Sequence, residues 1–89
     1  MNFNCNEFRV SIYGDGDREY DGYFLVVFDE FDECANPTMR KKALYVESKS
    51  NSIEEVYEFV KHLIRTDLLK AVRNYERLTV RKIWEVTTD

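Results

Sequence analysis

Apolar and polar positions alternate near the start of the chain in a way that predicts β-strands. Phe8, Val10 and Ile12 are separated by more polar neighbours, the period of two that is typical of a strand with one buried face. Residues 22–28, GYFLVVF, are apolar at successive positions, which is typical of a central strand covered on both faces or paired on both edges. Residues 43–48, ALYVES, predict a third strand.

The period changes to that of a helix after Ser52. Ser52 and Glu55 have the spacing of a capping box, in which the hydroxyl caps the helix and the Glu side chain reaches back. The apolar residues that follow at helical spacing are Ile53, Val56, Tyr57, Val60, Leu63 and Ile64. The same stripe continues to Leu78. One helix over 53–78 would be about 39 Å long, so Thr66-Asp67 predicts a kink or the start of a second helix.

The end of the chain returns to a strand pattern. Residues 78–88, LTVRKIWEVTT, are rich in β-branched side chains and alternate. The predicted order is therefore β-β-β-α-(α)-β, an α+β fold with a small, mostly antiparallel sheet and one or two helices packed on one face. A chain of 89 residues is expected to form a single domain, 1–89.

Composition supports a folded protein of the cytoplasm. The chain is 44% hydrophobic and 15% aromatic, which is sufficient for a packed core. The longest apolar run, 23–28, is far shorter than the ~20 residues of a membrane span, and the start of the chain lacks the features of a signal peptide. Cys5 and Cys34 are then expected to be reduced. Without a CxxC pair they do not predict zinc, and we expect no cofactor.

Residues 13–24, YGDGDREYDGYF, raise the question of a calcium site. Asp17, Glu19 and Asp21 match the first half of an EF-hand loop. The twelfth position of that loop is Phe28, which cannot bind a metal ion. The segment therefore predicts a hairpin turn of unusual charge rather than a metal site.

A second candidate site lies at the end of the strand 43–48. Glu47-Ser48-Lys49 resembles the (D/E)xK element of the restriction-endonuclease-like nucleases. That resemblance implies an Mg²⁺ ion held by Glu47 and by Asp29 or Asp32, with Lys49 orienting the attacking water. An Mg²⁺-dependent nuclease with Asp29, Glu47 and Lys49 as catalytic residues is therefore one alternative function.

Charge is unevenly distributed along the chain. Residues 1–35 carry nine acids and two bases, whereas residues 36–89 carry eleven bases and eight acids. Lys70, Arg73 and Arg77 would share one face of the predicted second helix and could contact phosphates. Direct nucleic-acid binding through this face is a further alternative, which the overall pI of about 5.0 disfavours.

The acids of the first half give the leading hypothesis, which is a protein-binding surface. Phe31 lies among acids in the repeat FDEFDE; it either anchors in a partner or folds back onto the core. The candidate partner-binding residues are Asp15, Asp17, Glu19, Asp21, Asp29, Glu30, Phe31, Asp32 and Glu33. They would form one surface only if both loops lay at the same end of the sheet, and alternating strand directions favour opposite ends.

The layout of the chain resembles that of small phage-encoded anti-defence inhibitors, anti-CRISPR proteins among them. The short sheet is represented by YFLVVF and ALYVES, and the capped helix by SIEEVYEFVKHL. The resemblance implies a non-catalytic inhibitor in the host cytoplasm, whose acids occupy a basic, nucleic-acid-handling surface of a partner protein. The pattern leaves the oligomeric state open.

Overall fold

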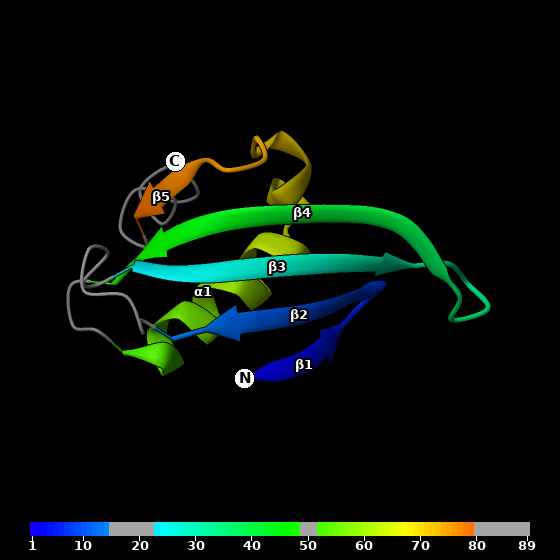
Figure 1. The fold of residues 1–89 in the computed structure, drawn as a ribbon, viewed down its shortest axis with the longest axis horizontal. Helices are drawn as coiled ribbons and strands as arrows, with labels where there is room; N and C mark the ends of the chain where they lie inside the picture. The colour runs from blue at the N-terminus through cyan, green and yellow to red at the C-terminus, as the bar shows by residue number, and fades with distance from the viewer. Residues whose placement is uncertain (15–22, 49–51, 80–89) are drawn as a thin grey trace.

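A computed structural model describes residues 1–14, 23–48 and 52–79, and every structural statement below refers to these. They form one five-stranded sheet with a helix packed against one face (Figure 1). The strands are β1 (Asn2–Cys5), β2 (Phe8–Tyr13), β3 (Tyr23–Phe31), β4 (Pro37–Glu47) and β5 (Arg77–Thr79). The helices are α1 (Ile53–Arg65) and the 3₁₀ helix η2 (Leu68–Ala71).

The strands lie in the sheet in their order along the chain, β1-β2-β3-β4-β5. The first four are antiparallel, while β5 runs parallel to β4. Parallel neighbours need a crossover connection, and α1 and η2 supply it. This connection places α1 behind the sheet in the view of Figure 1. The α+β fold class predicted from the sequence is confirmed.

The core lies between α1 and one face of the sheet. Alternate residues of β2, β3 and β4 are buried there, as the period of two predicts. The sheet contributes Val10, Ile12, Phe24, Val26, Phe28, Leu44 and Val46, and α1 contributes Val56, Phe59, Val60, Leu63 and Ile64. This packing buries one face of β2, β3 and β4 against α1.

The start of α1 follows the predicted capping box with one change. The Ser52 hydroxyl accepts a hydrogen bond from the Glu55 amide at 3.4 Å. The buried Ser48 hydroxyl accepts from the Ser52 amide at 3.2 Å and donates to the Glu55 carboxylate at 3.1 Å. Ser48 thus links the two residues of the box and fixes the end of β4 to the start of the helix.

The predicted second helix is much shorter than the stripe to Leu78 indicates, because the chain turns soon after α1. Asp67 adopts a left-handed conformation with φ 62°, which a continuing α-helix cannot contain. Only the four residues of η2 follow. The Lys42 ammonium group holds η2 to the sheet by donating to the carbonyls of Leu69 and Val72. Leu78, which the stripe assigned to the helix, is buried in β5.

The strands also differ from the predicted ranges. The N-terminal strand β1 pairs with β2 and was not predicted from its sequence, NFNC. The strands β3 and β4 extend into the segment 29–41, between the two predicted strands, and leave only residues 32–36 between them. Of the predicted last strand, residues 80–88 lie outside the described residues.

Candidate binding interface

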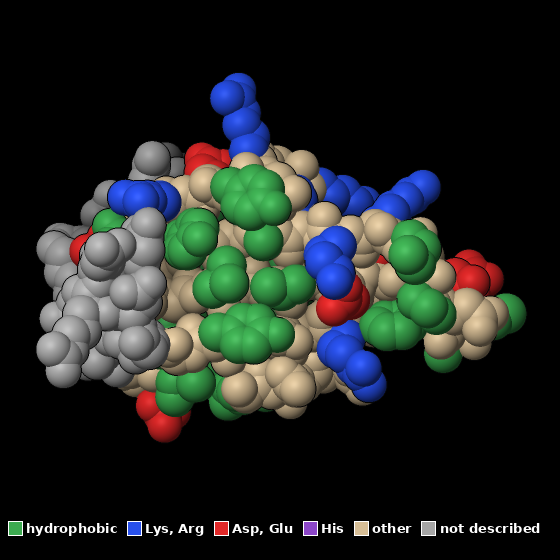
Figure 2. Space-filling model, in the orientation of Figure 1, with side chains coloured by type: hydrophobic (Ala, Val, Ile, Leu, Met, Phe, Trp, Pro, Cys, Tyr) green, Lys and Arg blue, Asp and Glu red, His purple; other side chains and the backbone are tan. Residues whose placement is uncertain are grey.

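The face of the sheet opposite α1 is apolar at its centre and has no layer over it among the described residues. Figure 2 views this face: hydrophobic side chains gather over the middle of the sheet, and both basic (Lys, Arg) and acidic (Asp, Glu) side chains lie around them. Leu25, Val27, Ala43 and Tyr45 alternate with the buried positions of β3 and β4 and are only half-buried. A contiguous apolar patch on a folded domain commonly marks an interaction site.

The register of the strands arranges these residues in rows across the sheet. The first row is Tyr13, Leu25, Tyr45 and Arg77, the second is Ser11, Val27 and Ala43, and the third is Arg9, Asp29 and Lys41. Residues directly opposite each other on neighbouring strands have their Cβ atoms about 5 Å apart. We call the surface formed by these three rows, together with Tyr75, the open face.

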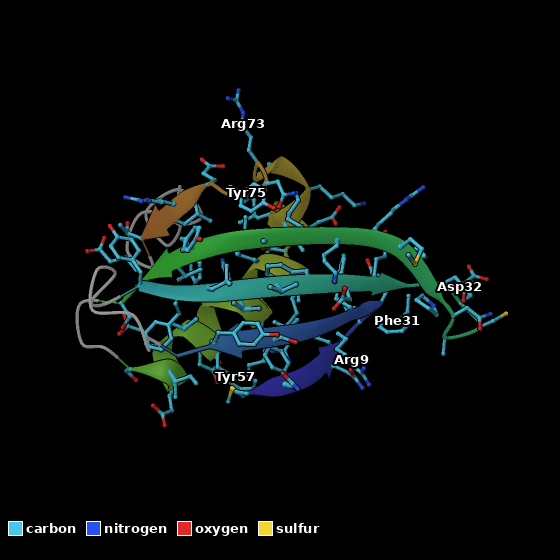
Figure 3. The ribbon with its side chains drawn as sticks, viewed as in Figure 1. Arg9, Phe31, Asp32, Tyr57, Arg73 and Tyr75 are labelled. Atoms are coloured by element: carbon cyan, nitrogen blue, oxygen red, sulfur yellow. The ribbon has the colours of Figure 1, made fainter. Side chains whose placement is uncertain are left out.

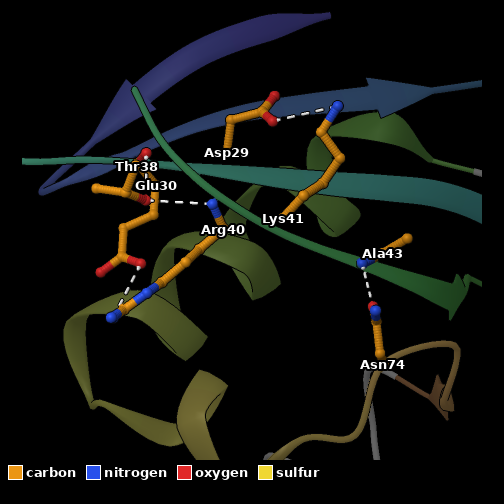
Figure 4. Close-up of polar contacts among 7 residues, drawn as sticks. All are labelled: Asp29, Glu30, Thr38, Arg40, Lys41, Ala43 and Asn74. Atoms are coloured by element: carbon orange, nitrogen blue, oxygen red, sulfur yellow. Dashed lines mark hydrogen bonds and ion pairs between the residues drawn. The ribbon is translucent and has the colours of Figure 1, made fainter. Parts of the chain in front are cut away.

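Tyr75 extends the open face beyond β4, in an unusual backbone conformation. Its φ is 64°, a left-handed value that is costly for a bulky residue, and 69% of the residue is exposed. Its amide donates to the Ala43 carbonyl at 2.6 Å, and the Ala43 amide donates to the side-chain oxygen of Asn74 (Figure 4). These bonds fix the turn before β5 against β4, with Arg73 projecting from the same edge (Figure 3).

Charged side chains border the apolar centre. Lys41 forms an ion pair with Asp29 at 3.5 Å (Figure 4), and the Arg9 guanidinium lies 5.8 Å from the centre of the Phe31 ring. Arg77 lies in the same way 5.7 Å from the ring centre of Tyr23. The border therefore carries charges of both signs. Its bases are Arg9 and Lys41 at the end of the sheet near Phe31, and Arg77 in β5.

The acids of the segment 29–33 are largely engaged within the protein. Besides the pair of Asp29 with Lys41, Glu30 lies 3.8 Å from Arg40 (Figure 4). One Asp32 carboxylate oxygen accepts from the amides of Cys34 and Asn36, at 2.9 and 2.8 Å, and so shapes the turn.

Phe31 lies at the same end of the molecule. It is half-buried beneath Arg9 rather than packed into the core (Figure 3). Beside it is a hollow of about 350 Å³ that is lined in part by Glu7, Asp32 and Glu33.

Tyr13, which leads into the first acidic segment, lies at the opposite end of the sheet from the segment 29–33. Tyr13 pairs with Leu25 near the start of β3, whereas Phe8 pairs with Glu30 near its end. Asp15, Asp17, Glu19 and Asp21 follow Tyr13 in the chain and lie outside the described residues. The ends of β3 are about 27 Å apart, at 3.4 Å per residue, so the segment 29–33 and the start of the acidic turn do not meet.

The residues of the nuclease hypothesis are not brought together. Asp29 pairs with Lys41, whereas Glu47 pairs with Tyr23 at the other end of the same two strands. Six residues of strand separate the two carboxylates by about 20 Å, too far for one Mg²⁺ ion, and Asp32 lies further still along the chain. Lys49 lies outside the described residues, which contain no group of three His, Cys, Asp or Glu side chains arranged to hold a metal.

The basic residues of the nucleic-acid hypothesis do not share a helical face, so that expectation is wrong. Lys70 belongs to η2 and pairs with Asp67 at 3.3 Å. Arg73 lies in the turn after η2, and Arg77 begins β5. Arg73 and Arg77 instead flank Tyr75 at the edge of the open face.

The sequence contains a signal for the open face, which is the uninterrupted apolar run of β3. The apolar run of β3 fits a strand covered on both faces, but α1 covers only one. Leu25 and Val27 are therefore the residues left half-buried. Tyr75 continues the helical stripe of the sequence, and only the turn before β5 places it on the open face.

No helix among the described residues is both long enough and apolar enough to cross a membrane. No protein family, curated protein or solved structure matches the chain.

Proposed function

We propose that this is a non-catalytic binding protein whose interface is the open face. The observation that carries the proposal is that the apolar centre, Leu25, Val27 and Ala43, is only half-buried, whereas the other face of the sheet is packed against α1. Removing apolar surface from water contributes about 25 cal/mol per Å², so a partner that covered this centre would gain binding free energy from it.

The side chains around the centre support the same function. Tyr13 and Tyr75 are 56% and 69% exposed, and Arg73 lies beside Tyr75. Tyr and Arg are the residue types that, with Trp, most often dominate the binding free energy of protein interfaces. An apolar centre with such a border has the composition of a docking surface.

The proposal is tested by comparing what the protein and two of its variants retain from a lysate of the source cell. Val27→Lys places a charge at the centre of the open face, and Thr66→Lys places the same charge at the exposed end of α1. We expect a stoichiometric partner to be retained by the wild type and by Thr66→Lys, and lost by Val27→Lys. Equal retention by all three proteins would show that the open face is not the interface.

A second candidate function is the acidic inhibitor of anti-defence type, acting in the host cytoplasm on a basic, nucleic-acid-handling protein. The observation that favours it is the hollow beside Phe31, which Glu7, Asp32 and Glu33 border. Carboxylates next to an aromatic ring could receive a Lys or Arg side chain of a partner.

This second function predicts a different set of sensitive residues. Changing Asp15, Asp17, Glu19 and Asp21 together to Lys, or Glu30 and Glu33 to Lys, should abolish partner binding while the circular dichroism spectrum stays that of a folded protein. Binding that survives both charge reversals would remove the acidic mechanism and leave the open face as the interface.

A further inference from the structure

The strand β1 forms one edge of the sheet (Figure 1), and part of its backbone has no partner among the described residues. The Ile12 amide donates to the Met1 carbonyl at 2.8 Å, and the Met1 amino group donates to the Ile12 carbonyl at 3.0 Å. Bonded and non-bonded pairs alternate in an antiparallel ladder, so the odd-numbered residues of this segment bond to β2. The amides and carbonyls of Asn2 and Asn4 therefore point away from the sheet.

The sequence of β1 does not protect this edge. Exposed edge strands are commonly kept from pairing with other chains by charged side chains or by proline. The strand β1, NFNC, contains neither. Addition of a strand to such an edge is a common mode of protein association, so the free backbone of β1 is a candidate interaction surface.

The residues of this edge read in the same order in both directions from Phe3. Asn2 and Asn4 flank it, and the apolar residues Met1 and Cys5 flank these in turn. Two copies of the strand that pair antiparallel about a two-fold axis at Phe3 place Asn2 of each copy opposite Asn4 of the other. Because Asn2 and Asn4 are the residues whose backbone groups point outward, both of these pairs exchange backbone hydrogen bonds.

The side chains also match across this axis. On the side of α1, Phe3 is half-buried with its ring centre 4.6 Å from that of Tyr57. It would lie opposite Phe3 of the second copy in a non-bonded pair, where side chains are closest and aromatic pairs are favourable. On the other side Asn2 and Asn4 are exposed. Their amide groups both donate and accept hydrogen bonds, so opposing Asn side chains can bond to each other.

This symmetry favours a second copy over a strand from a different protein. A foreign strand would need a free edge but would not require the same residue at both outward positions. A two-fold interface between identical chains does require a surface that is complementary to itself. The pairing also brings no like charges together, because β1 is uncharged.

From these observations we infer that the protein forms a symmetric dimer in which β1 pairs with β1 of a second copy. The two sheets join into one, with the two-fold axis perpendicular to it at Phe3. Both open faces then lie on the same side, and their β3 strands are five strand spacings, or about 24 Å, apart. The dimer does not depend on the function proposed above, but it would present two docking surfaces to one partner.

Sedimentation equilibrium between about 5 µM and about 1 mM protein tests the inference. We expect the mass to rise from that of the 10.7 kDa chain toward twice that value. A short edge gives a small interface, so we expect a dissociation constant on the order of 100 µM.

Two double variants test the register of the pairing. Asn2→Lys with Asn4→Lys places like charges opposite each other in both pairs and should weaken the dimer at least about tenfold. Asn2→Lys with Asn4→Asp places opposite charges in the same pairs and should restore association. Circular dichroism checks that both variants are folded. In the unmodified protein, the amide resonances of Asn2, Phe3 and Asn4 should shift with protein concentration.

Each opposing result has a definite meaning. A protein that stays monomeric up to about 1 mM, concentration-dependent shifts confined to other residues, or a dimer that both lysines leave intact overturns the inference. If neither double variant associates, the pairing of Asn2 with Asn4 is wrong. A dimer that Val27→Lys dissociates would place the contact on the open face instead. Sedimentation tests β1, whereas lysate capture tests the open face, so the failure of one inference is distinguishable from the failure of the other.

Discussion

At the scale of single residues, Tyr75 combines an unfavourable backbone with an exposed ring. A left-handed conformation costs an L-residue about 1–2 kcal/mol, and with 69% of the residue exposed the side chain recovers little of this by packing. Strained residues of this kind tend to occur at functional sites. The position of Tyr75 at the edge of the open face agrees with that tendency.

Replacing Tyr75 by Gly should therefore separate stability from binding. We expect Tyr75→Gly to raise the free energy of unfolding in urea by up to about 1 kcal/mol, since the relief of strain outweighs the added freedom of the unfolded chain. The same variant should bind a partner of the open face more weakly.

Met39 offers a matched control, because it has a φ of 66° and is 90% exposed, but it lies in β4 near the segment 32–36. Met39→Gly should give a similar gain in stability and leave binding unchanged. A loss of stability in Tyr75→Gly would instead indicate that the ring has a structural role.

At the scale of the elements, adjacent positions of β3 have opposite environments. Val26 is fully buried beneath α1, and Val27 is half-buried on the open face. We expect Val26→Lys to prevent folding, because it buries a charge without a partner and loses core packing. We expect Val27→Lys to lower the free energy of unfolding by less than about 1 kcal/mol.

Thermal unfolding followed by circular dichroism distinguishes the two variants. A cooperative transition in Val27→Lys and none in Val26→Lys is the expected result. If Val27→Lys were also unfolded, the open face would be part of the stabilising core rather than a surface available for binding.

The helices and strands differ in how well the sequence predicts them. The strands β2, β3 and β4 and the start of α1 follow from local patterns, so their existence was predicted, and the Ser52 cap was predicted to the residue. The end of the helical region depends on a left-handed Asp67 and on the bonds from Lys42 to Leu69 and Val72, which are contacts between distant segments. No local pattern encodes such contacts.

The candidate site was less predictable for the same reason. Leu25, Val27 and Ala43 were recognised as strand residues, but only the tertiary structure determines which faces a helix covers. The sequence places Arg73 and Arg77, together with Lys70, on one face of a predicted helix. Their position beside Tyr75 depends on the turn that replaces the predicted helix.

At the scale of the whole molecule, the sheet has long central strands and short edges. The strands β2 to β4 contain 6, 9 and 11 residues, whereas β1 and β5 contain 4 and 3. The central strand β3 is hydrogen-bonded on both sides. Short edge strands open with low free energies, and central strands open only with the whole domain.

Amide hydrogen exchange followed by NMR should reproduce this order. We expect the slowest exchange at the amides of Val26 and Phe28, and exchange faster by at least about two orders of magnitude in β1 and β5. Equal protection of β5 and β3 would contradict this expectation and indicate that β5 is fixed by contacts beyond its pairing with β4.

The strand order β1-β2-β3-β4-β5 has a consequence for how the protein is made. Each strand that leaves the ribosome can pair with the one made just before it, and none has to insert between two strands already joined. The helix α1 is synthesised after β4, so the nascent sheet is bare on both faces until α1 docks and covers one of them. The centre of the open face then forms as soon as β3 and β4 pair, and a partner present at that stage could bind it before α1 docks on the other face.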